Sequence, residues 1–193
     1  MNIGVDLDGV LFDTENYYRT LSMIYEVENN GSGEIDREAL FFKERFGWSM
    51  EKSREFLRNT YVEVLENSSI MHCAKYVINK LKEKGHKLYI ITARGSVIKE
   101  EIPITEKKLK EEGLEFDGYY YASKNKAQVC KDLKIDVMID DHYDNIEKIS
   151  NEKIKCLYYR DLVLRFIDNE QYVHEVRNWG DIYKEILNFD SWK

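Results

Sequence analysis

The sequence predicts an α/β fold in which a doubly wound parallel sheet carries helices on both faces. From about residue 70 onward, short apolar runs alternate with amphipathic stretches, a rhythm typical of strand–helix–strand units. Between residues 14 and 69, by contrast, apolar residues recur at helical spacing and no stretch reads as a strand. We therefore expect an α/β core formed by residues 1–13 and 70–193, with residues 14–69 as a helical insertion after the first strand.

Length and composition fit one such core with a small insertion. The chain has 193 residues, 43% of them hydrophobic, and a single proline, which argues against a long disordered linker. A net charge of −7 and a pI near 5.3 exclude the basic footprint of a protein that binds duplex nucleic acid. No apolar run is long enough to span a membrane, and we expect no signal peptide. Cys73, Cys130 and Cys156 lack zinc-binding spacing and are expected to be buried, reduced thiols of a cytoplasmic protein.

The expected elements follow one another in a regular order. The first strand, residues 2–6, is a short apolar run, and the insertion then holds three amphipathic stretches, at residues 14–27, 36–46 and 50–65. Further strands are expected at residues 87–92, 118–121, 136–140, 155–158 and, as an edge strand, 173–176. Helices are expected between and after them, at residues 73–84, 105–112, 126–133, 142–150 and 181–188.

Two carboxylates lie at the end of the first strand with one residue between them. In extended backbone, residues two apart point to the same side, so Asp6 and Asp8 converge on one small volume. Like charges this close are costly unless a cation or a proton lies between them. Oxygen ligands of this kind favour a hard divalent metal, and Mg²⁺ fits best. A lone pair of this spacing is common near turns, so the interpretation depends on the polar residues further along the chain.

Polar residues end two further strands of the expected sheet. Thr92, Ala93 and Arg94 follow the second strand, and Asp140 and Asp141 follow the fourth. In such sheets ligands bind outside the carboxyl ends of the strands. Polar residues at the end of one strand are common because loops are polar, but polar ends on three strands together indicate a functional site. A lysine that opens the preceding helix completes the set: we prefer Lys126 to its rival Lys124 because one helix and a short turn separate it from the fourth strand.

Four stretches in this order, DLDGVLFDT, IITAR, Lys126 and MIDDHYDN, resemble the motifs of the haloacid dehalogenase superfamily of phosphatases. The resemblance covers residues 1–13 and about 70–193. It implies the Rossmann-like core of that family, with residues 14–69 as a small helical cap that closes over the site and reads the leaving group. The motifs are specific for the superfamily but not for a substrate.

The resemblance also implies roles for individual residues. Asp6 is expected to be the nucleophile that forms an aspartyl-phosphate, and Asp8 the general acid and later the base. Mg²⁺ is expected to bind Asp6, Asp140 and the backbone carbonyl of Asp8. Asp141 is expected to orient these ligands without binding the metal directly, or to act through a water molecule.

The remaining motif residues are expected to bind phosphate. Thr92, the Ala93 backbone N–H and Lys126 hold the phosphoryl oxygens in this interpretation. Arg94 either contacts the substrate or a second phosphate, or is an exposed arginine in a salt bridge.

The resemblance also implies the reaction: the phosphatases of this family have an aspartate at the place of Asp8 and the dehalogenases lack it, so phosphoester hydrolysis is favoured over dehalogenation. The small cap, MIDDHYDN and the pattern around Trp179 look similar to the 5′(3′)-deoxyribonucleotidases and related bacterial nucleotidases, although Ala93-Arg94 replaces a serine-proline pair. The leading hypothesis is therefore a Mg²⁺-dependent 5′-nucleotidase. A sugar-phosphate phosphatase or a phosphomutase on the same core is the alternative, and a non-catalytic phosphate-binding module is a third.

Aromatic residues are the candidates for contact with a nucleotide base. Phe12, Phe41 and Trp48 are the main ones, and Phe42 and Phe46 are also considered, but their spacing is equally that of a helix that buries one face. The partner is expected to be a small phosphorylated molecule, neither duplex nucleic acid nor a membrane. The tail at residues 189–192 packs either on the core or on a second subunit of a homodimer.

Overall fold

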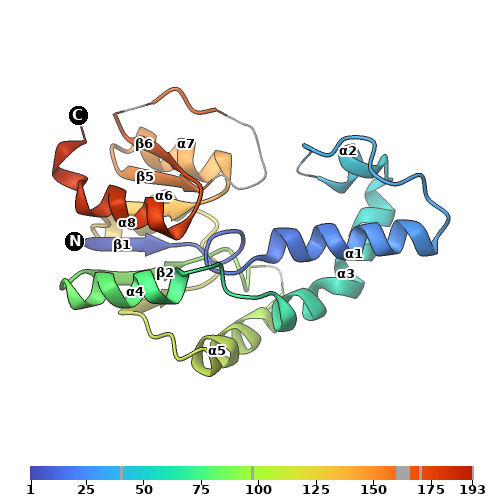
Figure 1. Ribbon diagram of the computed structural model, residues 1–193, viewed down its shortest axis with the longest axis horizontal. Helices are drawn as coiled ribbons and strands as arrows, with labels where there is room; N and C mark the ends of the chain where they lie inside the picture. Colours follow the sequence, from blue (N-terminus) through green and yellow to red (C-terminus); the bar gives the residue numbers. More distant parts are fainter. Residues whose placement is uncertain (40, 97, 160–165, 170, 193) are drawn as a thin grey trace.

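A computed structural model describes residues 1–39, 41–96, 98–159, 166–169 and 171–192, and shows a six-stranded sheet whose neighbouring strands are all parallel (Figure 1). The strand order is β3-β2-β1-β4-β5-β6. The strands are β1 (Asn2–Val5), β2 (Lys87–Ile91), β3 (Gly118–Tyr120), β4 (Val137–Asp140), β5 (Lys155–Tyr159) and β6 (Val173–Val176). The predicted doubly wound α/β fold is confirmed, and β6 lies at an edge, as expected.

The order of the strands reverses between β1 and β4. These two strands are neighbours although more than a hundred residues separate them, and Val5 is in register with Ile139. The backbone N–H of Asp6 continues this pairing by donating to the Ile139 carbonyl at 3.0 Å. In open α/β sheets the crevice at such a switch point is the usual ligand site. The register therefore brings Asp6 beside Asp140, the last residue of β4.

Two hydrophobic clusters cover the two faces of the sheet. One contains Ile3, Val5 and Ile90 and packs against α4 (Ala74–Glu83) and α8 (Trp179–Leu187). The other contains Ile91 and Met138 and packs against α6 (Lys126–Asp132) and α7 (Tyr143–Asn151). Side chains alternate along a strand, and β2, β4 and β5 contribute residues to both clusters. The core is thus buried on both faces, as a parallel sheet requires.

Three helices within residues 14–39 and 41–69 lie beyond the carboxyl end of β1, and we call them the helical unit (Figure 1). Its helices are α1 (Thr14–Glu28), α2 (Phe42–Phe46) and α3 (Met50–Asn67), and its apolar side chains form their own cluster around Trp48 and Phe56. The expected helices at residues 14–27 and 50–65 are confirmed. The expected helix at residues 36–46 is wrong for most of its length, because only Phe42–Phe46 is helical.

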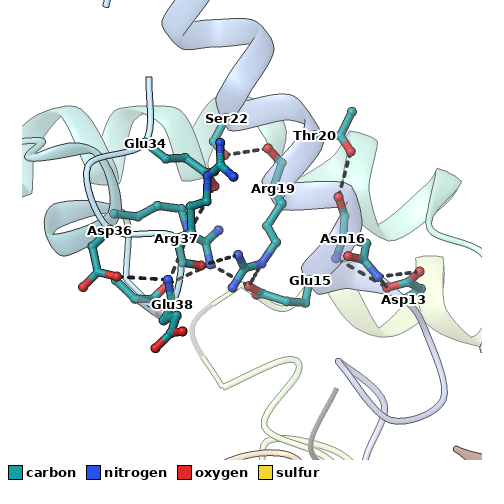
Figure 2. A network of polar contacts seen from close by, with 12 residues as sticks. Asp13, Glu15, Asn16, Arg19, Thr20, Ser22, Glu34, Asp36, Arg37 and Glu38 are labelled. Atoms are coloured by element: carbon teal, nitrogen blue, oxygen red, sulfur yellow. Dashed lines mark hydrogen bonds and ion pairs between the residues drawn. The ribbon is translucent and has the colours of Figure 1, made fainter. Parts of the chain in front are cut away.

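A buried arginine explains that short helix. The Arg45 guanidinium donates to the Ala39 carbonyl and pairs with Glu15 at 3.0 Å, while the Arg45 carbonyl accepts from Ile35 and Asp36. These contacts wrap the segment before α2 around Arg45 instead of leaving it helical. Figure 2 shows the neighbouring part of this network, in which Arg19 bonds Glu15 and the Arg37 carbonyl.

The helical unit is attached to the core at the ends of α1 and α3. Asp13 donates its N–H to the Ser69 carbonyl at 2.9 Å, so the segment that leaves the core and the segment that returns to it lie side by side. From the core, Lys108 of α5 (Glu101–Glu111) donates to the carbonyls of Leu65, Glu66 and Ser68 at the end of α3. A cation at this position also suits the negative end of the helix.

Helix α5 begins earlier than the sequence indicates. The expected helix at residues 105–112 starts at Glu101, because Pro103 lies in the first turn, where its missing N–H has no intrahelical partner to lose. Over the described residues, no helix is both long and apolar enough to cross a membrane.

The tail at residues 189–192 packs on the core. Trp192 is buried and stacks on His174 of β6 with ring centroids 3.8 Å apart, and Lys155 lies over the Phe189 and Trp192 rings. The first of the two alternatives for this segment is therefore the observed one.

Candidate active site

Three carboxylates meet at the carboxyl ends of β1 and β4. One oxygen from each of Asp6, Asp140 and Asp141 lies within 4.8 Å of the others. Asp140 is fully buried and Asp6 is 6% exposed, so water screens these charges poorly. The adjacency of β1 and β4 in the sheet produces this cluster, because each strand delivers its terminal aspartate to the same edge.

Lys126 joins two of the carboxylates. Its ammonium lies 2.8 Å from Asp6 Oδ2 and 2.6 Å from Asp140 Oδ2 and is almost wholly buried. The side chain of Asn125 accepts from the N–H of Gln128 and so starts α6 at Lys126, which places this lysine at the end of the helix nearest the sheet. Lys124 is exposed, and the structure brings only Lys126 of the two rival lysines into the carboxylate cluster.

Asn145 orients Asp140 and was missed in the sequence. Its amide donates to Asp140 Oδ1 at 3.1 Å and Oδ2 at 3.2 Å, and the His142 N–H donates to Oδ1 at 2.8 Å. Asn145 lies in the first turn of α7, five residues after Asp140. The final letter of MIDDHYDN was the available signal for it.

Gly9 makes room for Asp141. Its φ of +69° lies in the left-handed region, and a Cβ built on it would overlap the Asp141 carboxylate. Close approach of backbone and carboxylate therefore requires glycine here. Asp141, which the sequence placed behind the metal ligands, has one oxygen in the same cluster as those of Asp6 and Asp140.

The charges of this cluster do not balance. Burial raises the pKa of Asp6 to about 6, although Lys126 opposes the rise and Asp140 adds to it. Burial and the neighbouring carboxylates of Asp140 and Asp6 hold the pKa of Asp141 well above its usual range. One ammonium thus faces three crowded carboxylates. The donor set consists of carboxylate oxygens from three residues, and one ammonium does not balance three carboxylates. Such a set fits a hard divalent cation such as Mg²⁺.

Arg94 holds the carboxylate of Asp8. Its Nε lies 2.9 Å from Asp8 Oδ2 and its Nη2 lies 2.6 Å from Oδ1, a bidentate pair, and Nη1 donates to Thr105 Oγ1 at 2.8 Å. Burial would raise the pKa of Asp8, but the charge and hydrogen bonds of Arg94 outweigh it and lower that pKa. Arg94 is itself buried, which corrects the alternative that it is an exposed arginine. The Asp8 side chain remains 46% exposed.

Backbone hydrogen bonds hold the loop after β2 in place. Thr92 donates its N–H to the Tyr120 carbonyl at 3.0 Å, and its own carbonyl accepts from Ser123 at 2.9 Å. Thr92 is buried, whereas the next residue, Ala93, is exposed at the end of the strand. The loop therefore presents Ala93 to solvent and turns Arg94 back toward Asp8.

A cavity of about 240 Å³ lies between this edge of the sheet and the helical unit. Asp8, Gly9, Arg94 and Asp141 line it from the core, and Glu101 lines it from α5. The side from α1 and α3 consists of Thr14, Glu15, Tyr18, Tyr61, Val64 and Leu65. Tyr18 and Tyr61 were missed in the sequence. Thr14 and Tyr18 are four residues apart and so share one face of α1, which was the available signal.

The aromatic residues expected to contact substrate do not line this cavity. Phe12 is fully buried beneath Arg94 and Lys108, which lie 5.1 and 5.0 Å from its ring centre. Trp48 is buried in the helical unit, where its ring packs against other aromatic rings and its Nε1 donates to Glu26. Phe41 is 58% exposed on the outside. Burial of apolar area against neighbouring helices, rather than ligand binding, explains Phe12 and Trp48.

Comparison with known proteins identifies the fold. No protein-family model matches the chain. A nucleotidase of Clostridium acetobutylicum is 22% identical over 188 residues, which are 95% of this chain and 92% of that protein. A haloacid dehalogenase-like hydrolase of Xanthomonas campestris superposes with a TM-score of 0.68 at 16% identity, over 99% of this chain and 96% of that one. One from Streptococcus pneumoniae gives 0.66 at 16% identity, over 98% and 97%.

A third structure carries a ligand. CbbY of Rhodobacter sphaeroides, in complex with xylulose-1,5-bisphosphate, superposes with a TM-score of 0.59 at 12% identity, over 93% of this chain and 95% of that one. At these identities the likeness concerns the fold. The chain has the fold of the haloacid dehalogenase-like hydrolases, as its four motifs imply.

Proposed function

We propose that this chain, with the fold of haloacid dehalogenase-like hydrolases, is a Mg²⁺-dependent phosphomonoester hydrolase. The observation that carries the proposal is the convergence of Asp6, Asp140, Asp141 and Lys126 at a cavity that Asp141 and Asp8 line. A buried ammonium among carboxylates suits a reaction in which the negative charge of a phosphoryl group must be neutralised. The arrangement lies at the switch point of the sheet, where ligands of such folds bind.

The chemistry divides between two aspartates. Asp6 attacks phosphorus, its oxygen forms the new P–O bond, and the bond to the leaving oxygen breaks, which leaves an aspartyl-phosphate. Asp8 gives a proton to the leaving oxygen and later takes one from the water that hydrolyses the intermediate. Arg94 favours the ionised form that the second half needs. The negative charge of the bound phosphoryl group favours the protonated form that the first half needs.

The other residues bind and orient. Asp6, Asp140, Asp141 and the Asp8 carbonyl would hold Mg²⁺, which supplies charge neutralisation at the phosphoryl oxygens when bound. Lys126 adds a fixed positive charge from below. Thr92 and the Ala93 backbone N–H are proposed to donate to the phosphoryl oxygens from the loop after β2.

For the substrate we propose a nucleoside monophosphate, cleaved at its 5′-phosphate. The match to a nucleotidase over 95% of this chain supports this choice. A sugar-phosphate phosphatase or a phosphomutase is the second candidate, because a structure of the same fold, CbbY, holds a pentulose bisphosphate. The cysteines Cys73, Cys130 and Cys156 are all free, which supports a reducing cytoplasm as the place of action.

The test is phosphate release from purified protein with Mg²⁺. We expect hydrolysis of nucleoside monophosphates, and its loss in Asp6→Asn, which keeps the shape of the side chain but removes the nucleophile. A preference of more than about tenfold for sugar phosphates would favour the second candidate over the nucleotidase. Failure to hydrolyse either class, and an aryl phosphate as well, would overturn the enzyme proposal.

A further inference from the structure

The wall of the cavity holds more acidic side chains than basic ones. Of the described residues that line it, Asp8, Glu15, Glu101 and Asp141 are acidic, and Arg94 is the single cation. We infer that the site accepts esters with one phosphate on an otherwise uncharged, hydroxyl-bearing leaving group, and that it rejects bisphosphates. The inference rests on the proposed function and specifies its substrate class.

The charge of Arg94 is already paired with Asp8. Two of its nitrogens are paired with Asp8 and the third donates to Thr105. The guanidinium is almost fully buried, so its direction is set by these contacts. Lys126 is not among the residues that line the cavity, and its ammonium is paired with Asp6 and Asp140. The described part of the wall therefore offers a second anion no cation of its own.

Glu101 makes the α5 side of the cavity acidic. It is the first residue of α5, and its Oε2 accepts from the Gly95 N–H at 2.6 Å. The start of a helix attracts anions, and here a carboxylate of the protein already occupies that place. A phosphate that approached from this side would meet a fixed negative charge at short range.

Glu15 lines the cavity on the α1 side, but its charge is already paired. Its Oε1 accepts from Arg19 Nε at 2.8 Å and from Arg45 Nη2 at 3.0 Å. Figure 2 shows the carboxylate of Glu15 turned toward Arg19 within the helical unit. Neither arginine is among the described residues that line the cavity, so neither offers a second phosphate a cation there.

What remains suits a small neutral group with hydroxyls. Carboxylates accept hydrogen bonds from hydroxyl groups, and Tyr18 and Tyr61 supply phenol groups on the facing helices. A phosphomutase that moves a phosphoryl group between two hydroxyls must hold a bisphosphate on the way. The same charges therefore favour the hydrolase over the mutase.

The test compares matched esters on the wild-type protein with Mg²⁺. We would measure kcat/KM for adenosine 5′-monophosphate against adenosine 3′,5′-bisphosphate, and for ribose 5-phosphate against ribulose 1,5-bisphosphate. We expect each bisphosphate to be at least about 30-fold poorer than its monophosphate, the scale of discrimination that unpaired like charges provide. Ratios within about threefold in both pairs would overturn the inference, while hydrolysis of the monophosphates would leave the proposed function intact.

A charge variant separates electrostatics from size. Glu101→Gln keeps an oxygen for the Gly95 N–H but removes the charge. It should therefore reduce the ratio of kcat/KM for monophosphate to kcat/KM for bisphosphate about three- to tenfold. Glu106→Gln, on an exposed position of the same helix and outside this cavity, should leave the ratio within about twofold. An unchanged ratio in Glu101→Gln would overturn the electrostatic explanation. If no ester is hydrolysed, the proposed function fails, and calorimetric binding of the adenosine pair to Asp6→Asn still decides the inference.

Discussion

Asp6 should weaken the fold that carries it. Its pKa rises from the usual 3.8 to about 6 in the folded chain, mainly through burial. One pKa unit corresponds to about 1.4 kcal/mol, so the ionised carboxylate costs the folded state about 3 kcal/mol. Because the folded pKa is the higher one, this cost is nearly absent at pH 4, grows as pH rises toward 6 and is complete above it.

Asp6→Asn removes that cost while nearly keeping the shape of the side chain. In the metal-free protein at pH 8 we expect the free energy of unfolding to increase by up to about 3 kcal/mol, and by less than about 1 kcal/mol at pH 4. The amide oxygen still accepts from Lys126, which keeps its pair with Asp140. Urea unfolding followed by circular dichroism, in a chelator and across this pH range, measures the difference.

Two comparisons make the result decisive. Asp190→Asn, at an exposed position, should change stability by no more than about 0.5 kcal/mol at any of these pH values. Added Mg²⁺ should stabilise the wild type more than Asp6→Asn, because the variant lacks one of the three clustered carboxylates. The reasoning is refuted if Asp6→Asn is the less stable protein at pH 8 without metal, or if the difference does not vary with pH.

Three further substitutions probe the surroundings. Arg94→Lys should lower kcat about tenfold or more in steady-state kinetics, since lysine cannot hold Asp8 through two nitrogens, and an unchanged kcat contradicts this. Gly9→Ala should cost about 1–2 kcal/mol in urea unfolding. It should also raise the Mg²⁺ concentration for half-maximal activity about tenfold, because the new Cβ displaces Asp141, and an unaltered Mg²⁺ titration argues against that role. Lys108→Met should destabilise the protein by about 1–3 kcal/mol, since carbonyls at the end of α3 lose their donor, whereas exposed Lys110→Met should not.

Features with a local cause could be read from the sequence. The strand that ends directly before Asp6, the helix that begins at Lys126 and the strand that ends at Asp140 each follow from the apolar pattern of a few neighbouring residues. The parallel sheet then implies that such ends share one edge, so the candidate carboxylates could be named in advance. The prediction was wrong at residues 36–39 and 41, where contacts to the buried Arg45 replace the expected helix.

The aromatic residues show why a pattern alone does not locate a ligand. Trp48 and Phe12 have the chemistry of a base-stacking surface, but both bury their rings against neighbouring helices and cations. The same apolar area serves either purpose, and the packing of α1, α2 and α3 decides between them. Tyr18 and Tyr61 reach the cavity because their helices turn those faces toward the sheet.

The sequence by itself determined the order of strands and helices, the carboxylates at the strand ends and the lysine that accompanies them, because each depends on neighbours along the chain. Only the tertiary structure decided what those groups contact. The pairing of Arg94 with Asp8 joins residues 86 positions apart, and Lys126 bridges two aspartates from strands that are distant in sequence. Such distances follow from strand register and helix packing, which the periodicity of a single element does not contain. The charge of the cavity wall is likewise a property of the folded chain, since its acidic residues come from four separate segments.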